Sequence, residues 1–476
     1  MGKTRTKEKP NWLDPNTTAE NEKLPGYLKW AWSSRGMSLA LNVIVLGQIT
    51  YYCMDMLGMS ATLAGMLLLA SKLFDGVTDL CVGYIIDRTH SKFGKARPYE
   101  LCIVFVWLLT VLLYSTPEMG TTGKAVFVFI MYTLINSIFA TFLNGGDAVY
   151  LARSIRSPEN RVSIMSFNGG MVMLLSIVAS ILLPQLVATL GATKSGWPVI
   201  ALLFAVPMAI IGMLRFVFVK EVVTESENAA EVAPKEEVKA APKEKIPLKT
   251  SLQCILKNKY IFMLACMTLM VQLTTNIGTS VNTYYFKYII GDISLASLIS
   301  MSSILTPVIM LIFPTLTRRF GTVNILRAGA AMGVCGYALR TIGGTNLATL
   351  VLGSLIGNMG VLPISMMISI YLIDCMDYGE WKTGVRVEGM LGSLTSFTNK
   401  LGSGMASGMV GIIMGAAGYD AALEVQSSTA LASIVGLFNI LPLALMVILL
   451  ILSLMYKLDK LMPQIKADLA KRKTEA

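Results

Sequence analysis

Long apolar stretches alternate with short polar connectors along most of the chain. Apolar residues occupy all sides of each predicted helix instead of one narrow stripe, which is the pattern of helices in lipid. A helix needs about 20 apolar residues to cross a hydrocarbon layer of about 30 Å. On this basis we place twelve transmembrane spans at residues 36–57, 62–86, 99–115, 125–149, 161–190, 197–219, 259–289, 293–316, 323–342, 346–373, 388–417 and 428–456.

Positive charge is concentrated in alternate connectors. The basic connectors lie at residues 88–97, 153–161, 318–327 and 382–386, whereas the others hold little positive charge beyond Lys124 and Lys194. By the positive-inside rule, the basic connectors are cytoplasmic. Because the number of spans is even, we expect both termini in the cytoplasm and a multi-pass protein of the cell inner membrane.

One connector differs from the rest and divides the chain. Residues 222–245 are rich in Ala, Pro, Glu and Lys and cannot bury apolar surface, so they predict a disordered cytoplasmic linker. Two halves of six helices each are the plan of the major facilitator fold, an all-α membrane protein. The predicted units are a tail at 1–27, a half at 28–221, a linker at 222–250, a half at 251–456 and a tail at 457–476.

Composition and charge exclude several functional classes. Hydrophobic residues make up 54% of the chain and charged residues 14%, against about 25% charged in soluble proteins. The net charge of +11 is spread over connectors and forms no nucleic-acid-binding face. A single histidine and seven scattered cysteines provide no metal site, so a membrane enzyme or receptor is the less favoured alternative and no resident cofactor is expected.

The second span carries the densest group of ionisable residues. Asp75 and Asp79 are four residues apart, so their Cβ atoms lie about 5–6 Å apart on one helix face. Two carboxylates this close in a low dielectric cannot both stay ionised without a proton or a cation between them. The pair therefore predicts a site for Na⁺, Li⁺ or H⁺, with Lys72 pairing to Asp75 when the cation is absent. The alternative is that both acids form permanent ion pairs that fix helix packing.

Two further spans contain polar residues that need partners. Lys400 in the eleventh span is expected to face the interior and meet a carboxylate of the second span across the two halves; its alternative is to reach the membrane surface. In the fourth span, two glycines expose backbone beside Thr141, Asn144 and Asp147, which predicts a cavity lining. Asp147 has an alternative partner in Arg153.

These residues resemble a known family. The pattern Lys72-x-x-Asp75-x-x-x-Asp79 and its continuation to Pro98 is similar to the signature of the glycoside–pentoside–hexuronide:cation symporters, the melibiose-permease-like family of the major facilitator superfamily. The stretch 374–388 looks like the loop of that family between spans 10 and 11. The resemblance covers residues 25 to 460 and implies alternating access in a functional monomer that carries a small polar solute.

The resemblance also implies roles for individual residues. It places the cation at Asp75, Asp79, Thr78 and Thr141, with Lys72 and Lys400 as coupling counter-ions. The expected solute-binding residues are Asn144, Asp147, Ala148, Ser365, Thr395, Ser396 and Asn399. The expected cytoplasmic gate consists of Asp87, Arg88, Lys95, Arg97, Asp377, Glu380, Arg386 and Glu388.

The solute is where this sequence departs from the family. Asn144 stands where sugar-binding relatives have an acid, Leu39 replaces another acid, and Ala148 and Ser365 replace aromatic platforms. Carboxylates and aromatic rings are the usual partners of a pyranose. We therefore expect cation-coupled symport of a sugar or glycoside, with a non-sugar organic anion or amphiphile as the alternative solute.

Overall fold

The computed structural model describes residues 24–89, 91, 93–155, 158–221, 258–384, 389–423 and 425–475, and within these ranges its regular structure is helical. The N-terminal half contains α1 (Gly26–Leu46), α2 (Ile49–Tyr51), α3 (Ala61–Asp87), α4 (Cys102–Tyr114), α5 (Thr121–Thr133), α6 (Thr141–Gly145), α7 (Asp147–Ser154), α8 (Pro158–Thr189) and α9 (Gly196–Phe218). The predicted linker at 222–250 lies outside the described residues.

The C-terminal half repeats this plan. It contains α12 (Lys259–Tyr285), α13 (Ala296–Met301), α14 (Thr306–Phe320), α15 (Thr322–Gly343), α16 (Leu347–Thr383), α17 (Gly389–Ala416), α18 (Ser428–Val435), α19 (Leu441–Met455) and α20 (Leu458–Glu475). Wider π-helical turns lie at Tyr52–Met56, Leu134–Ala140, Phe286–Ile290 and Gly436–Ile440. Tighter 3₁₀ turns lie at Arg97–Leu101, Ile293–Leu295 and Ser302–Leu305.

Each predicted span falls on helix, and eight helical segments among the described residues are long and apolar enough to cross a membrane. The helices over the second, eighth, ninth and eleventh predicted spans, which are α3, α14, α15 and α17, are not among those eight. The all-helical membrane fold is thus confirmed, whereas the number of twelve crossings stays a prediction.

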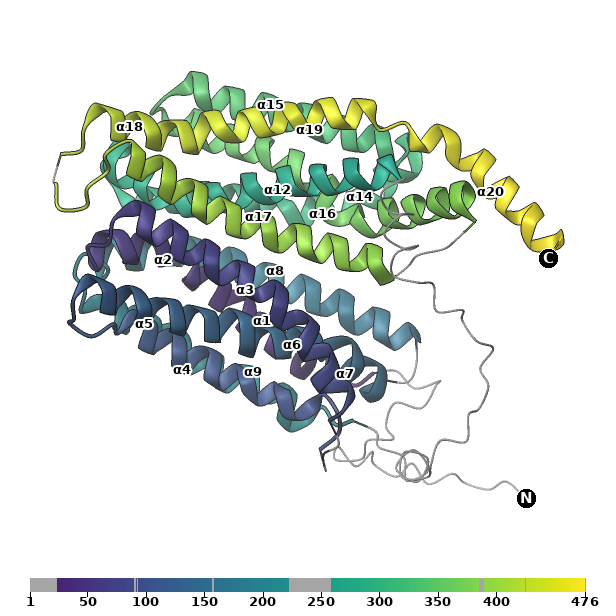
Figure 1. The fold of residues 1–476 in the computed structure, drawn as a ribbon, viewed down its shortest axis with the longest axis horizontal. Helices are drawn as coiled ribbons and strands as arrows, with labels where there is room; N and C mark the ends of the chain where they lie inside the picture. Colours follow the sequence, from purple (N-terminus) through teal and green to yellow (C-terminus); the bar gives the residue numbers. More distant parts are fainter. Residues whose placement is uncertain are drawn as a thin grey trace.

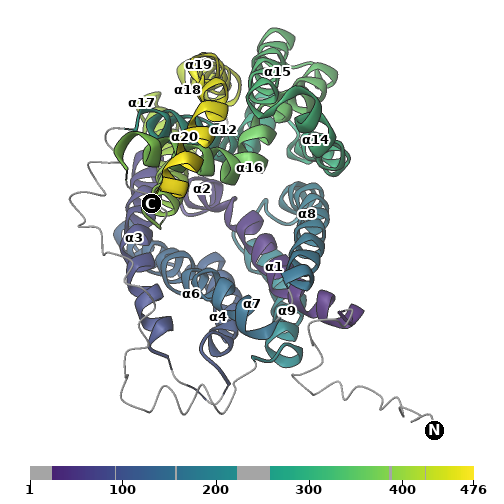
Figure 2. The same ribbon diagram turned by 90° about the vertical axis from the view of Figure 1, so that its right-hand side faces the viewer.

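The two halves form two helix bundles that lie side by side (Figure 1). Helices α1 to α9 make one bundle and α12 to α20 make the other, and Figure 2 shows both bundles along their helix axes. Helix α1 begins and α20 ends at the same end of the molecule, which we call the terminal end. The opposite end is called the far end.

A stripe of glycines brings the two halves together where α3 packs along α17. The stripe consists of Gly404, Gly408, Gly411 and Gly415, all on the face of α17 toward α3. A Cβ atom on Gly411 would lie 2.4 Å from the backbone oxygen of Ala61 and 2.6 Å from the Cα of Gly65. Small residues of this kind permit the close helix approach that holds helices together in lipid.

Helix α20 lies in the segment that the sequence predicted only as a tail. The apolar side chains of Leu458, Met462, Ile465 and Leu469 recur every three or four residues and are buried in the core of the C-terminal half. Helix α20 packs on α16, and the Trp381 indole donates a hydrogen bond to Asp468 at 2.9 Å. The amphipathic spacing in the sequence is the signal that predicts this helix.

The glycine stripe leads to a first prediction. We expect Gly411→Ala to lower the thermal stability of the purified protein in detergent, because overpacking costs about 1–3 kcal/mol and the crowded neighbours are backbone atoms. The control is Gly169→Ala on α8, where a Cβ would have nothing within 4 Å. Because alanine favours a helix by about 0.5–1 kcal/mol over glycine, the control should leave the melting temperature unchanged or raise it. Equal stability of both variants would contradict the packing argument.

Candidate ion and solute site

Helix α3 carries two carboxylates, and each meets an ammonium group. The Lys400 Nζ atom lies 2.5 Å from a carboxylate oxygen of Asp79, and the Lys72 Nζ atom lies 3.4 Å from one of Asp75. Lys400 also donates to the backbone carbonyl of Asp75 at 3.4 Å. Because Lys400 belongs to α17, its contact with Asp79 crosses the two halves, whereas Lys72 and Asp75 both lie on α3.

Residues of a π-helical turn contact the buried carboxylate of Asp75 and its partner Lys72. Ser137 donates a hydrogen bond to Asp75, and Asn136 accepts one from Lys72 at 3.2 Å. Both residues lie in the π-helical turn Leu134–Ala140, and the Thr141 hydroxyl donates to the Asn136 carbonyl at 3.0 Å. Such turns leave backbone carbonyls without helical partners and are frequent at functional sites.

The two carboxylates differ in exposure. The side chain of Asp75 is 5% exposed, whereas that of Asp79 is 38% exposed and its partner Lys400 is 28% exposed. An ion pair that water reaches contributes only about 0–1 kcal/mol, so a small ion can compete for a partly exposed pair more easily than for a buried one. A buried pair is harder to separate, because each charge would lose its partner in a low dielectric. Asp79 is therefore the accessible member and Asp75 the deep one.

A cavity of about 660 Å³ lies between the halves beside these pairs. Helices from both halves line it, and the described lining residues include no aspartate or glutamate. A volume of this size suits a small solute, and amides and hydroxyls provide its hydrogen-bonding groups. The larger polar residues of the lining are Gln48, Lys72, Tyr132, Asn136, Asn276, Asn282, Tyr337, Arg340 and Asn358.

The far end is held together by Asp55 and three residues of the C-terminal half. The Asp55 carboxylate accepts hydrogen bonds from Lys287 at 2.5 Å, Tyr288 at 3.0 Å and Tyr419 at 2.8 Å. We call these four residues the Asp55 cluster. Thr283 adds a further cross-half hydrogen bond to Gln48, which lines the cavity, at 2.7 Å. The contacts between the halves thus continue from the cavity wall to the far end.

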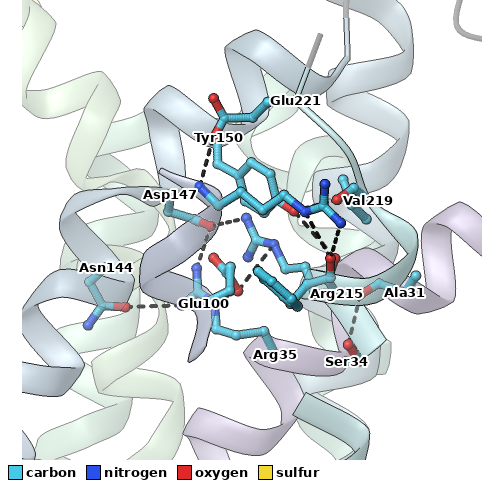
Figure 3. A network of polar contacts seen from close by, with 12 residues as sticks. Ala31, Ser34, Arg35, Glu100, Asn144, Asp147, Tyr150, Arg215, Val219 and Glu221 are labelled. Atoms are coloured by element: carbon cyan, nitrogen blue, oxygen red, sulfur yellow. Dashed lines mark hydrogen bonds and ion pairs between the residues drawn. The ribbon is translucent and has the colours of Figure 1, made fainter. Parts of the chain in front are cut away.

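A second charged network lies within the N-terminal half (Figure 3). Asp147 accepts hydrogen bonds from Arg35 and from Arg215, the latter at 2.6 Å. The Glu100 carboxylate lies 3.7 Å from both guanidinium groups. The Arg215 guanidinium also lies 3.6 Å from the centre of the Trp32 ring. All of these contacts are made within one half, so the network fixes α1, α7 and α9 together as a unit.

The family of MFS/sugar transport proteins matches residues 36–460, which is most of the chain. The chain belongs to this family. Its members are transporters and not enzymes, and the resemblance to the glycoside–pentoside–hexuronide symporters is confirmed.

Several relatives of the chain are named for sugar or glycoside solutes. The chain is 30% identical to the isoprimeverose transporter of Lactiplantibacillus pentosus, over 90% of this chain and 88% of that protein. It is 25% identical to the glucuronide carrier protein homolog of Escherichia coli K12, over 92% of this chain and 93% of that protein. A putative sulfoquinovose importer of the same organism is also 25% identical, over 87% of this chain and 86% of that protein.

Solved structures place the chain in the major facilitator fold. A bacterial homolog of the human lysosomal transporter Spinster superposes with a TM-score of 0.63 at 13% identity, over 91% of this chain and 97% of that one. A bacterial homologue of the human peptide transporters PepT1 and PepT2 gives a TM-score of 0.60 at 12% identity, over 93% of this chain and 100% of that one. At these identities the likeness concerns the fold alone.

The structure brings together the residues predicted for the cation of this symporter family. Asp75, Asp79, Lys72 and Lys400 lie in two touching pairs, as described above. Thr78 donates to the Asp75 backbone carbonyl at 3.0 Å, and Thr141 bonds the π-helical turn. The expectation that Lys400 meets a carboxylate of the second span across the halves agrees with its contact to Asp79.

The residues predicted for the solute are more scattered. Asn144 accepts a hydrogen bond from Arg35 at 3.3 Å, and Asp147 pairs with Arg35 and Arg215, whereas its alternative partner Arg153 forms an ion pair with Glu221. Ala148 and Ser365 are exposed, and Asn399 accepts a hydrogen bond from Gln272 at 3.0 Å. None of these lines the 660 Å³ cavity. The side chains of Thr395 and Ser396 lie outside the described set.

The predicted cytoplasmic gate is described only in part. Arg97 donates to the Phe216 carbonyl at 2.9 Å through Nε, and its backbone N–H and that of Lys95 donate to Glu221. Arg88, Asp377 and Glu380 lie on described segments of the terminal end, whereas the Asp87 side chain and residues 386 and 388 (Arg386 and Glu388) are outside the described set. The gate stays a prediction.

Sequence reasoning missed the Asp55 cluster, Glu100, Arg215 and Arg340. Each of these charged residues lies near an end of a predicted span, where a charge resembles an ordinary connector residue. All five charged residues nevertheless lie inside the bounds of predicted spans, Arg340 in the span at 323–342, so their positions in apolar stretches were an available signal.

The Asp55 cluster yields a second prediction. In Asp55→Asn we expect a cysteine introduced at Asn276 in the cavity to react at least about tenfold faster with an impermeant maleimide added from the far end, because the loss of one charged partner weakens the closed contact. The control is Glu118→Gln, whose partner Lys194 lies 2.6 Å away at the same end but within one half. The same labelling rate in Asp55→Asn and Glu118→Gln would exclude Asp55 as a closing contact.

Proposed function

We propose that this chain is a secondary active symporter, which couples inward movement of a monovalent cation to uptake of a sugar or glycoside by alternating access. The observation that carries the proposal is the Asp79–Lys400 ion pair. It is 2.5 Å long, it is partly exposed, and it joins the two halves beside a second Lys–Asp pair.

In this mechanism the cation competes with the lysines for the carboxylates. A cation at Asp79 and Asp75 takes over the negative charge that Lys400 and Lys72 now neutralise. The Lys400 contact across the halves then weakens, and the loaded carrier changes its conformation. The carboxylates of α3 can be neutralised either by the lysines or by the transported cation. Coupling follows because only the bound cation releases the lysine of α17 from its ion pair.

The solute assignment rests on the relatives and on the cavity. Relatives named for isoprimeverose, glucuronides and sulfoquinovose support a sugar or glycoside. The amides and hydroxyls of the cavity can bind sugar hydroxyl groups, and residues of both halves line it, as alternating access requires. The coupling ion is Na⁺, Li⁺ or H⁺, no resident cofactor takes part, and a monomer is sufficient because one chain forms the whole cavity.

Charge at the two ends supports an orientation in the membrane. The terminal end carries Arg88, Lys95, Arg97, Arg153 and Lys382 in helix ends and connectors, whereas Lys124 and Lys194 lie at the far end. By the positive-inside rule the terminal end faces the cytoplasm of a cell inner membrane. The Asp55 cluster then closes the outer side, and residues 88–97 and 374–388 form the proposed inner gate.

Uptake into proteoliposomes tests the proposal. The protein is supplied with a panel of radiolabelled neutral and acidic glycosides under a Na⁺ gradient alone and under an H⁺ gradient alone. Accumulation above the external concentration under one gradient supports symport and identifies the ion. Uptake that never exceeds equilibration under either gradient, with every solute of the panel, would overturn it.

The third prediction concerns the exposed carboxylate. We expect Asp79→Ala to abolish cation-driven accumulation while the protein remains in the membrane, because the cation loses a ligand and Lys400 loses its partner. Exchange of solute across the membrane without a cation gradient should persist. The control is Asp420→Asn, an exposed acid of the far end whose carboxylate accepts a hydrogen bond from the Ala422 N–H. Unimpaired accumulation by Asp79→Ala would remove the coupling assignment.

A further inference from the structure

Arg340 is a buried cation without an acidic partner among the residues that the structure describes. In the described part of the chain, most buried charged side chains take part in ion pairs, namely those of Arg35, Asp55, Asp75, Glu100, Arg215 and Glu221. Arg340 is only 5% exposed, and none of the described carboxylates lies within ion-pair distance of it. Its Nε atom has no hydrogen-bond partner.

An unpaired guanidinium is costly where it is buried away from water. Removing a charge from water costs several kcal/mol unless an opposite charge compensates for it. Charged residues within membrane helices are therefore retained mainly for function and face a cavity or a partner. Arg340 lies in the wall of the 660 Å³ cavity between the halves. The group that balances its charge is thus expected to enter through that cavity.

Part of the guanidinium is already used for structure. Its Nη2 atom donates to the Phe438 carbonyl at 3.0 Å, and the group lies 4.0 Å from the centre of the Phe438 ring. Phe438 belongs to the π-helical turn Gly436–Ile440, so this contact orients the side chain against a second helix. The orientation of Arg340 is thereby fixed before any solute arrives, which lowers the entropy lost on binding.

The cavity is suited to an anion as well as to hydroxyl groups. Its described lining contains two cations, Lys72 and Arg340, and no carboxylate. Lys72 is paired with Asp75, so Arg340 is the cation that remains available. Ser354 and Asn282 line the same cavity, and each has a buried side-chain oxygen without a hydrogen-bond partner. These groups can bind the neutral part of a polar solute.

We infer that Arg340 binds an anionic group, a carboxylate or a sulfonate, on the transported sugar, so that this carrier prefers acidic sugars to their neutral counterparts. The inference rests on the proposed function, because it names the solute class of the same cavity. The geometry of guanidinium favours both groups, since its N–H donors match two oxygens of an oxyanion at once.

Matched pairs of solutes test this preference in the full-length protein. Binding to the purified carrier is measured for methyl β-glucuronide against methyl β-glucoside, which share a ring and differ in a carboxylate against a hydroxymethyl group. A methyl sulfoquinovoside is measured in the same way as the sugar that carries a sulfonate. We expect at least one acidic sugar to bind at least about ten times more tightly than its neutral counterpart. The acidic sugar that binds more tightly identifies the preferred anionic group.

Two arginine variants separate recognition from structure. Arg340→Gln is expected to remove the preference, with about a tenfold or larger loss for the acidic sugar and less than about a twofold change for the neutral one. Arg340→Lys keeps the charge and should retain part of the preference. The control is Arg327→Gln on the same helix, whose arginine also donates to backbone carbonyls, of Ser453 and Tyr456, and does not line the cavity. It should leave the preference intact.

The outcomes distinguish this inference from the proposed symport. Equal or tighter binding of the neutral sugar, or no binding of either acidic sugar, overturns the inference. An equal loss for both sugars in Arg340→Gln, together with a lower melting temperature than Arg340→Lys, also overturns it and assigns Arg340 to packing. Concentrative uptake of a neutral glycoside under a cation gradient, with no preference for its acidic counterpart, would retain symport while rejecting the acidic solute.

Discussion

The close contact between α3 and α17 is the interaction on which the candidate site depends. In lipid, apolar side chains gain little by leaving one apolar surface for another, so two helices hold together by close backbone approach and polar contacts. The glycine stripe of α17 provides that approach, and Lys400 continues it one turn toward the terminal end, 2.5 Å from Asp79. The closest backbone approach of α17, at Gly411, and the charge that a cation would neutralise therefore lie on the same pair of helices.

The two charged contacts between the halves differ in strength. Asp55 is 1% exposed and is held by an ammonium and two phenol groups, whereas Asp79 is 38% exposed and has the single partner Lys400. A buried charge with several donors is costly to separate, but an exposed ion pair exchanges partners at little cost. A small ion can thus act on the α3–α17 contact while the Asp55 cluster keeps the far end closed. This asymmetry suits a carrier in which only one side opens at a time.

Sequence reasoning succeeded where charged residues lay far from the ends of a long apolar run. Asp75, Asp79 and Lys400 lie deep within predicted spans, where an ionisable group requires a partner, and the four-residue spacing places both acids on one face. It failed for Asp55 and Arg215, because a charge near a span end is indistinguishable from a connector charge. The partners of Arg35 come from α7 and the turn before α4, and the chain positions of these segments carry no information on which residues face one another.

The fourth predicted span shows the same limit of sequence reasoning, because the residue expected to bind the solute lies outside the cavity and an earlier residue lines it. This position also suggests how coupling works. Asn144 bonds Arg35 outside the 660 Å³ cavity, whereas Asn136, eight residues earlier and about 12 Å along a helix, lines it. Asn136 also accepts a hydrogen bond from Lys72, which pairs with Asp75 and lines the cavity itself. One ammonium thus belongs to both the cation site and the solute cavity. When an ion replaces Lys72 at Asp75, the same step changes the charge and the hydrogen bonds that the solute meets, so the two sites need no long pathway between them.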